Sequence, residues 1–236
     1  MRWSLTPRRR DDPELMDAPG LPEAEVRDAY HVLRRVNRQF FGGRRPITAE
    51  IEKFLRESPI PDRALTLLDV GSGSGDLTTV AAGVFTSRGY SPRSIALDRD
   101  PTALALAASD GLTAVRGDAL RLPFGDASID LVTAVKFAHH FHGETLGRLV
   151  SEMTRVARTR VLLLDIRRHW LAYAGFVAWS RVFTHNRLVR FDGPLSVLRA
   201  FTRDELLDLA GQSPDFSWTV RSYAGFQLAL VGTRVR

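Results

Sequence analysis

Short apolar runs alternate with stretches of helical periodicity between residues 64 and 166. The runs are hydrophobic at nearly every position, which is typical of strands buried on both faces of a parallel sheet. Regular alternation of strands and helices predicts an α/β fold with helices on both faces of that sheet. The expected strands cover residues 65–70, 94–98, 112–115, 129–135 and 160–166, and the expected helices cover 75–88, 101–108 and 143–157.

The segment before this region predicts helices. Residues 1–20 are rich in Pro, Asp and Arg, and we expect them to be flexible. From Pro22 to Phe40, apolar residues recur at three- and four-residue steps, which predicts an amphipathic helix that Gly42 and Gly43 end. A second, short helix is expected after Thr48. These helices could cover one edge of the main domain.

After Ile166 the simple alternation ends. An aromatic-rich stretch predicts a helix, and a capping-box pattern at 202–205 predicts the start of another that ends near Gly211. Two final strand candidates are joined by a short turn and must therefore be antiparallel. The expected elements are a helix over 168–184, a turn at Asp192–Gly193–Pro194, and strands over 216–223 and 226–233.

Composition narrows the classes of function. The 236 residues suit one domain, and the absence of cysteine excludes disulfides, thiolate nucleophiles and zinc–cysteine sites. A reducing cytoplasm is compatible with this, and the N-terminus shows no signal-peptide pattern. The longest apolar run, residues 170–179, is about half of the ~20 residues that a membrane span needs. We therefore expect a cytoplasmic protein without a membrane span.

The net charge of +6 raises the question of a nucleic-acid partner. Only Lys53 and Lys136 are lysines, so 31 of the 33 basic residues are arginines, and they are scattered along the chain. A bias of this kind fits a GC-rich coding sequence as well as it fits a binding surface. We expect no nucleic-acid partner.

The strongest chemical signal is the loop from Asp69 to Asp76, where a buried strand runs into a glycine turn and then a helix. Glycines allow a tight turn and let a ligand touch the main chain. The ligand would lie at a helix N-terminus, at the carboxyl edge of the sheet. A dinucleotide loop reads G-x-G-x-x-G, but its third glycine would fall on Asp76, whose carboxylate would repel a pyrophosphate.

A second acidic residue stands where the next strand ends. Asp98 follows Asp69 by 29 residues, and a carboxylate at that strand end can accept hydrogen bonds from ribose hydroxyls. The alternative role is structural, because Asp100-Pro101 looks like a helix start and Asp98 could simply cap it.

Three motifs in order, within residues 64–166, resemble class I S-adenosylmethionine-dependent methyltransferases. They are the loop G-x-G-x-G preceded by Asp69, the acidic strand end at Asp98, and Gly117-Asp118-Ala119 followed by Leu122-Pro123-Phe124 and by Asp126-x-x-Ile129-Asp130-Leu131-Val132. Ile129 replaces the usual aromatic residue of the last motif. The resemblance implies a Rossmann-like fold with a seven-stranded, mostly parallel sheet, an antiparallel last strand, an N-terminal helical cap and a helical insertion after the fifth strand.

The resemblance also implies S-adenosyl-L-methionine as cofactor and S-adenosyl-L-homocysteine as its product. Asp118 would accept from the adenine amino group, the Ala119 N–H would meet a ring nitrogen, and Leu120 would pack on the ring. The residues expected to bind the cofactor are Asp69, Gly71, Ser72, Gly73, Gly75, Asp98, Arg99, Asp118, Ala119, Leu120 and Val135. No residue is assigned to a metal.

A histidine pair follows the fourth strand, where a methyl acceptor would lie beside the sulfonium. Because histidine titrates near neutral pH, His140 or His139 could take a proton from a hydroxyl. Such a pair recurs in class I methyltransferases with unrelated substrates, so packing is the alternative role. Lys136, Trp170 and Tyr173 are expected to face the acceptor. The aromatic helix over 168–184 could line the acceptor site, but it could equally be an ordinary buried helix or the surface of a homodimer.

The layout resembles, more narrowly, small bacterial methyltransferases of quinols and polyketide phenols that act beside type III polyketide synthases. The resemblance lies in PELMDAPGLPEAEVRDAYHVLRRVNRQFFGG, in FAHHF, and in the stretch from LLLDIRRHW to AFTRDEL. It implies O-methylation of a small, hydrophobic, hydroxylated aromatic in secondary metabolism. It also implies a division into a flexible N-terminus (1–20), a helical cap (21–60) and a methyltransferase domain (61–236) with an acceptor-side insertion (168–200).

Four other functions stay open on the sequence. A C- or N-methyltransferase would share the same cofactor half. An RNA methyltransferase would need a clustered basic surface and usually a base-gripping motif such as N-P-P-Y, which this chain does not carry. The intact glycines, Asp98 and Asp118 argue against a non-catalytic binding module. The loop spacing argues against a nicotinamide oxidoreductase.

Overall fold

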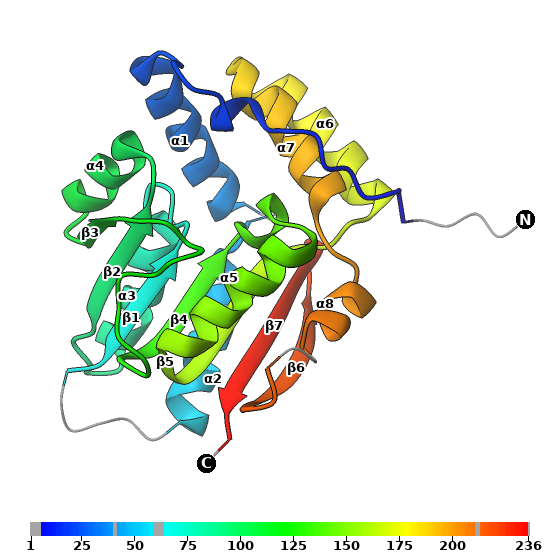
Figure 1. The fold of residues 1–236 in the computed structure, drawn as a ribbon. Coiled ribbons are helices and arrows are strands. Elements are labelled where there is room, and N and C mark those ends of the chain that lie inside the picture. The colour runs from blue at the N-terminus through cyan, green and yellow to red at the C-terminus, as the bar shows by residue number, and fades with distance from the viewer. Residues whose placement is uncertain (1–5, 40–41, 59–63, 211–212, 236) are drawn as a thin grey trace, which may run out of the picture.

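The computed structural model describes residues 6–39, 42–58, 64–210 and 213–235. Its centre is a seven-stranded sheet in the order β3-β2-β1-β4-β5-β7-β6, in which β7 runs antiparallel to both of its neighbours (Figure 1). This confirms the predicted Rossmann-like fold with an antiparallel last strand. The strands are β1 (Thr66–Val70), β2 (Arg93–Asp98), β3 (Thr113–Arg116), β4 (Ile129–Val135), β5 (Ala157–Ile166), β6 (Phe216–Tyr223) and β7 (Gln227–Arg234).

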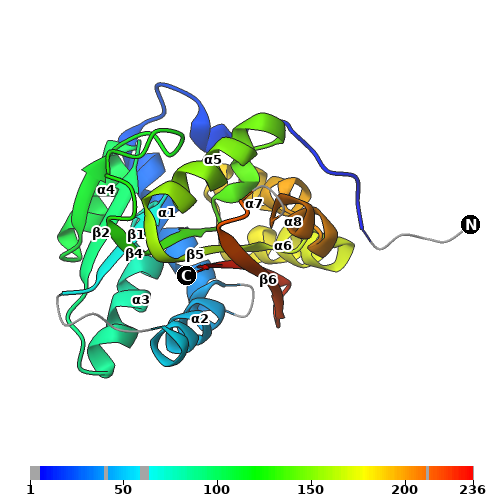
Figure 2. The same cartoon turned by 60° about the horizontal axis from the view of Figure 1, so that its bottom comes forward.

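Helices cover both faces of the sheet, as the uniformly apolar strands predict. Successive residues of a strand point to opposite faces, so Leu67 joins the core under α2 and α3 while Leu68 joins the core under α5 and α8. In Figure 2, α2 and α3 lie below the sheet and α5 lies above it. These helices are α2 (Arg44–Glu57), α3 (Asp76–Ser87), α5 (Gly143–Val156) and α8 (Arg203–Ala210), and α4 (Pro101–Ser109) packs beside β2 and β3.

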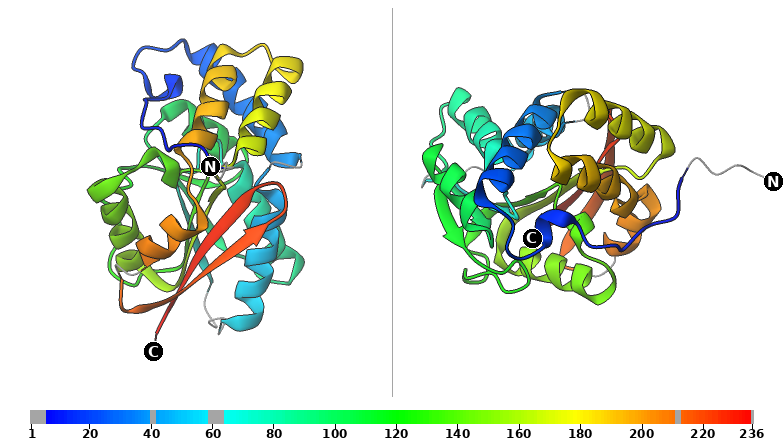
Figure 3. Two further views of the ribbon diagram at one scale, coloured as in Figure 1. Left: turned by 90° about the vertical axis from the view of Figure 1, so that its right-hand side faces the viewer. Right: turned by 90° about the horizontal axis from the view of Figure 1, so that it is seen from above.

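A third layer of helices lies over the carboxyl ends of the strands. It consists of α1 (Glu23–Arg38), α6 (Trp170–Phe183) and α7 (Arg187–Arg199), which share their own apolar core (Figure 3). The N-terminal segment runs past α7 before it enters α1, with a 3-10 turn η1 at Leu15–Asp17 (Figure 1). Within the described ranges, no helix is both long and apolar enough to cross a membrane.

The predicted turn at Asp192–Gly193–Pro194 is wrong, because all three residues lie inside α7. Asp192 and Gly193 each serve a contact made by the helix. The Asp192 carboxylate accepts hydrogen bonds from the N–H groups of Leu15 and Met16 at 2.7 and 2.9 Å. At Gly193, a Cβ atom would lie only 1.9 Å from the ring of Phe176. These polar and small residues therefore allow α7 to bind η1 and to pack closely against α6.

Two other boundaries also differ from the sequence prediction. Helix α2 begins at Arg44, before Thr48, because Pro46 fits within the first helical turn, where no N–H donor is needed. Helix α1 ends at Arg38, and Phe40, the predicted last residue of this helix, lies outside the described residues. The predicted capping box is confirmed, since the Glu205 carboxylate accepts from the Thr202 N–H at 2.8 Å and the Thr202 hydroxyl accepts from the Glu205 N–H.

Candidate active site

A cavity of about 940 Å³ lies at the carboxyl ends of β1, β2 and β4, beneath the helical layer. In open α/β sheets this is the edge where ligands bind. One end of the cavity is lined by the glycine loop, Asp98 and the 117–120 segment. The other end is lined by the histidine pair and apolar side chains of the helical layer. The cavity thus brings together most of the residues that the sequence singles out.

The glycine loop turns sharply because Gly71, Gly73 and Gly75 all have positive φ angles, of 65, 52 and 74°. At Gly71 there is also no room for a side chain, since a Cβ atom would lie 2.2 Å from the ring of Phe137. Gly71 and Gly73 line the cavity together with Ser72. Gly75 does not; its missing side chain lets the loop pack against Leu112. Gly75 therefore shapes the loop rather than touching a ligand.

Asp98 holds the loop in place from the end of β2. Its carboxylate accepts hydrogen bonds from the N–H groups of Gly73 and Asp100, at 2.8 and 3.0 Å. Burial raises the pKa of this carboxyl, and the backbone hydrogen bonds oppose the rise. Since Asp98 also lines the cavity, its remaining acceptor sites are available to a ligand.

The 117–120 segment and two flanking residues line the same end. Asp118 accepts a hydrogen bond from the Leu120 N–H at 2.9 Å, which fixes the turn in which Ala119 lies. Arg99 lines the cavity as well, but its side chain is 73% exposed and pairs with Asp17. Val135 lies at the end of β4, between the two ends of the cavity.

Asp69 is buried beneath the loop at the end of β1. Its carboxylate accepts hydrogen bonds from the hydroxyls of Thr78 and Thr133. Burial raises its pKa to about 7, and the two hydroxyls oppose that rise. The surrounding hydroxyl network thus anchors the first turn of α3 to the sheet.

Helix α1 closes over the glycine loop through contacts that the sequence did not predict. The Tyr30 hydroxyl donates to Asp100 at 2.9 Å, and Arg34 donates to the Ser74 hydroxyl and carbonyl oxygens at 2.9 and 2.7 Å. One turn further, the Asn37 amide donates to Asp76. These side chains recur on one face of α1 at steps of three and four residues, so the helix lies on the cavity as a roof.

Lys136 is partly buried and lies beneath α1. Its backbone has a positive φ of 54°, and its Nζ atom donates to the Asn37 side-chain oxygen at 3.0 Å. Burial lowers the pKa of its ammonium group to about 8, although the charge of Asp76 opposes the fall. Lys136 therefore lies between the glycine loop and the acceptor end of the cavity, and its position agrees with a ligand contact.

The histidine pair lies in the 3-10 turn η2 (Ala138–His140) that follows β4. His139 is 4% exposed, and its Nδ1 atom lies 2.9 Å from Asp165 at the end of β5. Burial acts to lower the pKa of His139, but the charges and hydrogen bonds of Asp165 and Glu14 outweigh it and raise the pKa to about 9. The His140 ring stacks on that of His139 at 4.6 Å, and its Nδ1 atom lies 3.3 Å from Asp17.

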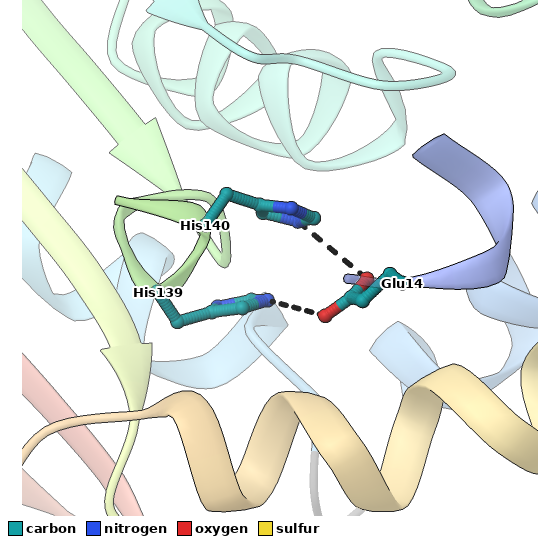
Figure 4. Close-up of side chains that lie close together, drawn as sticks. All are labelled: Glu14, His139 and His140. Atoms are coloured by element: carbon teal, nitrogen blue, oxygen red, sulfur yellow. Dashed lines mark ion pairs between the residues drawn. The ribbon is translucent and has the colours of Figure 1, made fainter. Parts of the chain in front are cut away.

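The N-terminal segment supplies residues to this end of the cavity, although its composition predicted flexibility. Glu14 is 7% exposed and faces both imidazole rings (Figure 4). The Ser196 hydroxyl of α7 donates to the same carboxylate at 2.8 Å. Sequence patterns could not single out Glu14 and Asp17 among the many charged residues of the terminus. Asp165 could have been found, since it ends a parallel strand beside β4.

Two residues expected at the acceptor lie elsewhere. Trp170 is 46% exposed and packs edge-on against Tyr173, and neither is among the cavity-lining residues of the described chain. Their helix, α6, reaches the cavity through Phe176. Apolar residues surround this helix on all sides, so the sequence pattern does not tell which of them line the cavity. Ile166 and Val189 complete the apolar wall.

Comparisons with known proteins agree with this geometry. Residues 68–164 match a family model described as a methyltransferase domain. The matched stretch runs from β1 to β5 and contains the glycine loop, Asp98, Asp118 and the histidine pair. No curated protein matches the sequence.

Solved structures with similar folds extend over nearly the whole chain. One is a SAM-dependent methyltransferase from Aquifex aeolicus, which is 14% identical, with a TM-score of 0.58 over 91% of this chain and 100% of the other. Another is magnesium protoporphyrin IX methyltransferase from Synechocystis PCC 6803 with bound SAH, also 14% identical, with a TM-score of 0.59 over 93% and 91% of the two chains. A third is the CurJ carbon methyltransferase, 13% identical, with a TM-score of 0.68 over 92% of this chain and 62% of the other.

Proposed function

We propose that this chain, whose residues 68–164 match a methyltransferase domain, is a class I S-adenosylmethionine-dependent methyltransferase that methylates a hydroxyl oxygen of a small, hydrophobic aromatic compound. A quinol or a polyketide phenol of secondary metabolism fits this description. The observation that carries the proposal is the position of His140 in the cavity, opposite the glycine loop and beside an apolar wall.

The proposed cofactor pose follows from the lining of the cavity. The ribose hydroxyls donate to Asp98, the adenine amino group donates to Asp118, and the ring packs on Leu120. The methionyl part passes Gly71 and Gly73 beneath α1. In this pose the sulfonium methyl group points past Val135 toward the histidine pair.

The proposed acceptor pose uses the other end of the cavity. The aromatic ring packs against Phe176, Ile166 and Val189, which suits an apolar compound. Its hydroxyl oxygen faces His140 in line with the S–CH3 bond. Correct alignment of the two reacting groups can contribute about 7–11 kcal/mol to catalysis, and the cofactor methyl is already activated.

His140 is better placed than His139 to take the hydroxyl proton. Asp17 holds the Nδ1 side of its ring, which leaves the Nε2 lone pair for the acceptor. His139 is buried, and the charge of Asp165 favours its protonated form. We therefore assign His140 as the base and His139 as the neighbour that fixes its ring by stacking.

The identity of the acceptor is tested with methyl-labelled S-adenosylmethionine and a panel of alkylated phenols and quinols. The expected product carries one labelled methyl group on a phenolic oxygen, as read by mass and NMR. A labelled carbon or nitrogen atom, or no labelled product from any hydroxylated aromatic, would contradict the proposed acceptor.

The role of His140 is tested separately with His140→Gln. Turnover should fall by about 10²–10⁴-fold, because base assistance is lost, while the affinity for S-adenosylhomocysteine changes little. The matched control is His185→Gln, since His185 is exposed at the end of α6. Full turnover in His140→Gln would remove this histidine from the mechanism.

A further inference from the structure

Three side chains from distant parts of the sequence meet at the acceptor end of the cavity. The Nε2 atoms of His139 and His140 both point at the carboxylate of Glu14, one toward each of its oxygens (Figure 4). The potential ligand atoms of the three residues all lie within 4.8 Å of one another. Glu14 comes from the N-terminal segment and the histidines come from η2, so the fold brings them together.

The separations within this cluster are too long for hydrogen bonds. The Glu14 oxygens lie 3.6 Å from His139 Nε2 and 3.7 Å from His140 Nε2. Zinc binds imidazole nitrogen and carboxylate oxygen at about 2.1 Å, so two ligand atoms of a tetrahedral site lie about 3.4 Å apart. The two Glu14–histidine separations exceed this value by only a few tenths of an ångström, and the two Nε2 atoms lie within 4.8 Å of each other, so a modest contraction of the cluster would bring all three side chains onto one ion.

The opposite nitrogen of each ring is already held by a carboxylate. Asp165 lies 2.9 Å from His139 Nδ1, and Asp17 lies 3.3 Å from His140 Nδ1. Metal-binding histidines almost always donate their other N–H in this way, which keeps a proton on Nδ1 and turns Nε2 toward the metal, and the ion takes the place of any proton on Nε2. The Ser196 hydroxyl orients Glu14 similarly.

The charges around the cluster also favour a cation. Glu14, Asp17 and Asp165 bring three carboxylates to two imidazole rings. The nearby guanidinium of Arg199 donates to the backbone carbonyls of His139 and His140, so it does not pair with these carboxylates. Arg99 pairs with Asp17 on the exposed side of the cluster, which among the described residues leaves Glu14 and Asp165 as carboxylates without a guanidinium partner, and a divalent ion would balance their charge.

We propose that Glu14, His139 and His140 form a binding site for one divalent transition-metal ion, of which Zn²⁺ and Co²⁺ are representative. Two imidazoles and one carboxylate are donors that suit such ions rather than Mg²⁺ or Ca²⁺. Three protein ligands also leave a coordination position open toward the cavity, where the acceptor lies.

The site itself does not depend on the proposed function, but its effect on activity does. An ion bound at His140 Nε2 occupies the lone pair that would take the acceptor proton. Metal binding and proton transfer to His140 therefore exclude each other, and we expect added Zn²⁺ to inhibit methyl transfer and a chelator to restore it.

The test is a titration of the chelator-treated full chain with Co²⁺, in the absence of cofactor and acceptor. Visible absorption of the bound Co²⁺ and calorimetry measure the binding. We expect one ion per chain. Glu14→Gln and His140→Gln should each weaken binding more than tenfold, and Asp17→Asn should weaken it by about tenfold through the orienting carboxylate. His185→Gln is the matched control and should bind as the wild type does.

Thermal unfolding of each variant shows whether it keeps the fold. The absence of saturable Co²⁺ binding to the wild type would overturn the site, and so would equal binding by the wild type, Glu14→Gln and His140→Gln. Turnover that requires Zn²⁺ would contradict the assignment of His140 as the base, while leaving the metal site supported.

Discussion

Replacement of Asp98 by Asn tests the cofactor pose at its most specific contact. The structure gives the carboxylate two backbone donors, the N–H groups of Gly73 and Asp100. Asparagine can keep its single oxygen on one of these donors, but its NH2 group cannot accept from the other or from a ribose hydroxyl. The substitution therefore removes the charged acceptor while it keeps the size of the side chain.

The expected loss follows from the strength of hydrogen bonds to charged groups. Such a bond contributes about 1.5–3 kcal/mol, which corresponds to roughly 10- to 150-fold weaker binding. Calorimetry with S-adenosylhomocysteine measures this loss without turnover. Asp208→Asn on the exposed side of α8 is the control for charge alone. Equal affinity of Asp98→Asn and wild type, with both folded, would refute the ribose assignment.

Three further changes test the packing and the electrostatics of the site. Gly71→Ala should cost about 2–5 kcal/mol in unfolding free energy and abolish cofactor binding, whereas Gly89→Ala, also at positive φ but in open space, should cost only about 1–2 kcal/mol. Asp69→Asn should become more stable than wild type as the pH rises from about 4 to 7, because burial raises the folded-state pKa of Asp69 from 3.8 to about 7 and its ionisation therefore opposes folding. The gain in unfolding free energy, roughly 4 kcal/mol at most, is measured by denaturant unfolding at several pH values. A difference between the two proteins that does not change with pH would contradict burial as the cause of the shift. Gly193→Ala should destabilise the fold by about 1–3 kcal/mol, because the added methyl group clashes with Phe176 of α6. Gly83→Ala in α3, which has open space around it, should instead stabilise the fold by up to about 1 kcal/mol. Equal effects of the two substitutions in thermal unfolding would show that α7 does not need a glycine at position 193.

The central sheet could be predicted almost residue by residue, because its signals are local. The run Ile129–Val135 is apolar enough to be buried on both faces, and the structure has β4 at the same residues. The glycine loop and Asp98 lie at strand ends, and parallel strands bring their carboxyl ends to one edge of the sheet. That topology alone places these residues around one cavity.

The helical layer could not be predicted as well, because its residues make contacts with segments that lie far away in the sequence. Asp192 and Gly193 resemble a turn in the sequence, yet they make contacts with η1 and Phe176 inside a helix. Trp170 and Tyr173 lie on a helix that is apolar on all sides, so the pattern does not tell which side faces the cavity. Glu14 acquires its role only when the N-terminal segment folds against η2.

A crystal structure of the chain with S-adenosylhomocysteine tests the proposed cofactor pose most directly. We expect ribose hydroxyls within hydrogen-bonding distance of Asp98, the adenine amino group on Asp118, and the sulfur atom facing His140 across the cavity. A nucleoside bound in this cavity with its ribose away from Asp98, or a sulfur atom turned away from the histidine pair, would contradict it.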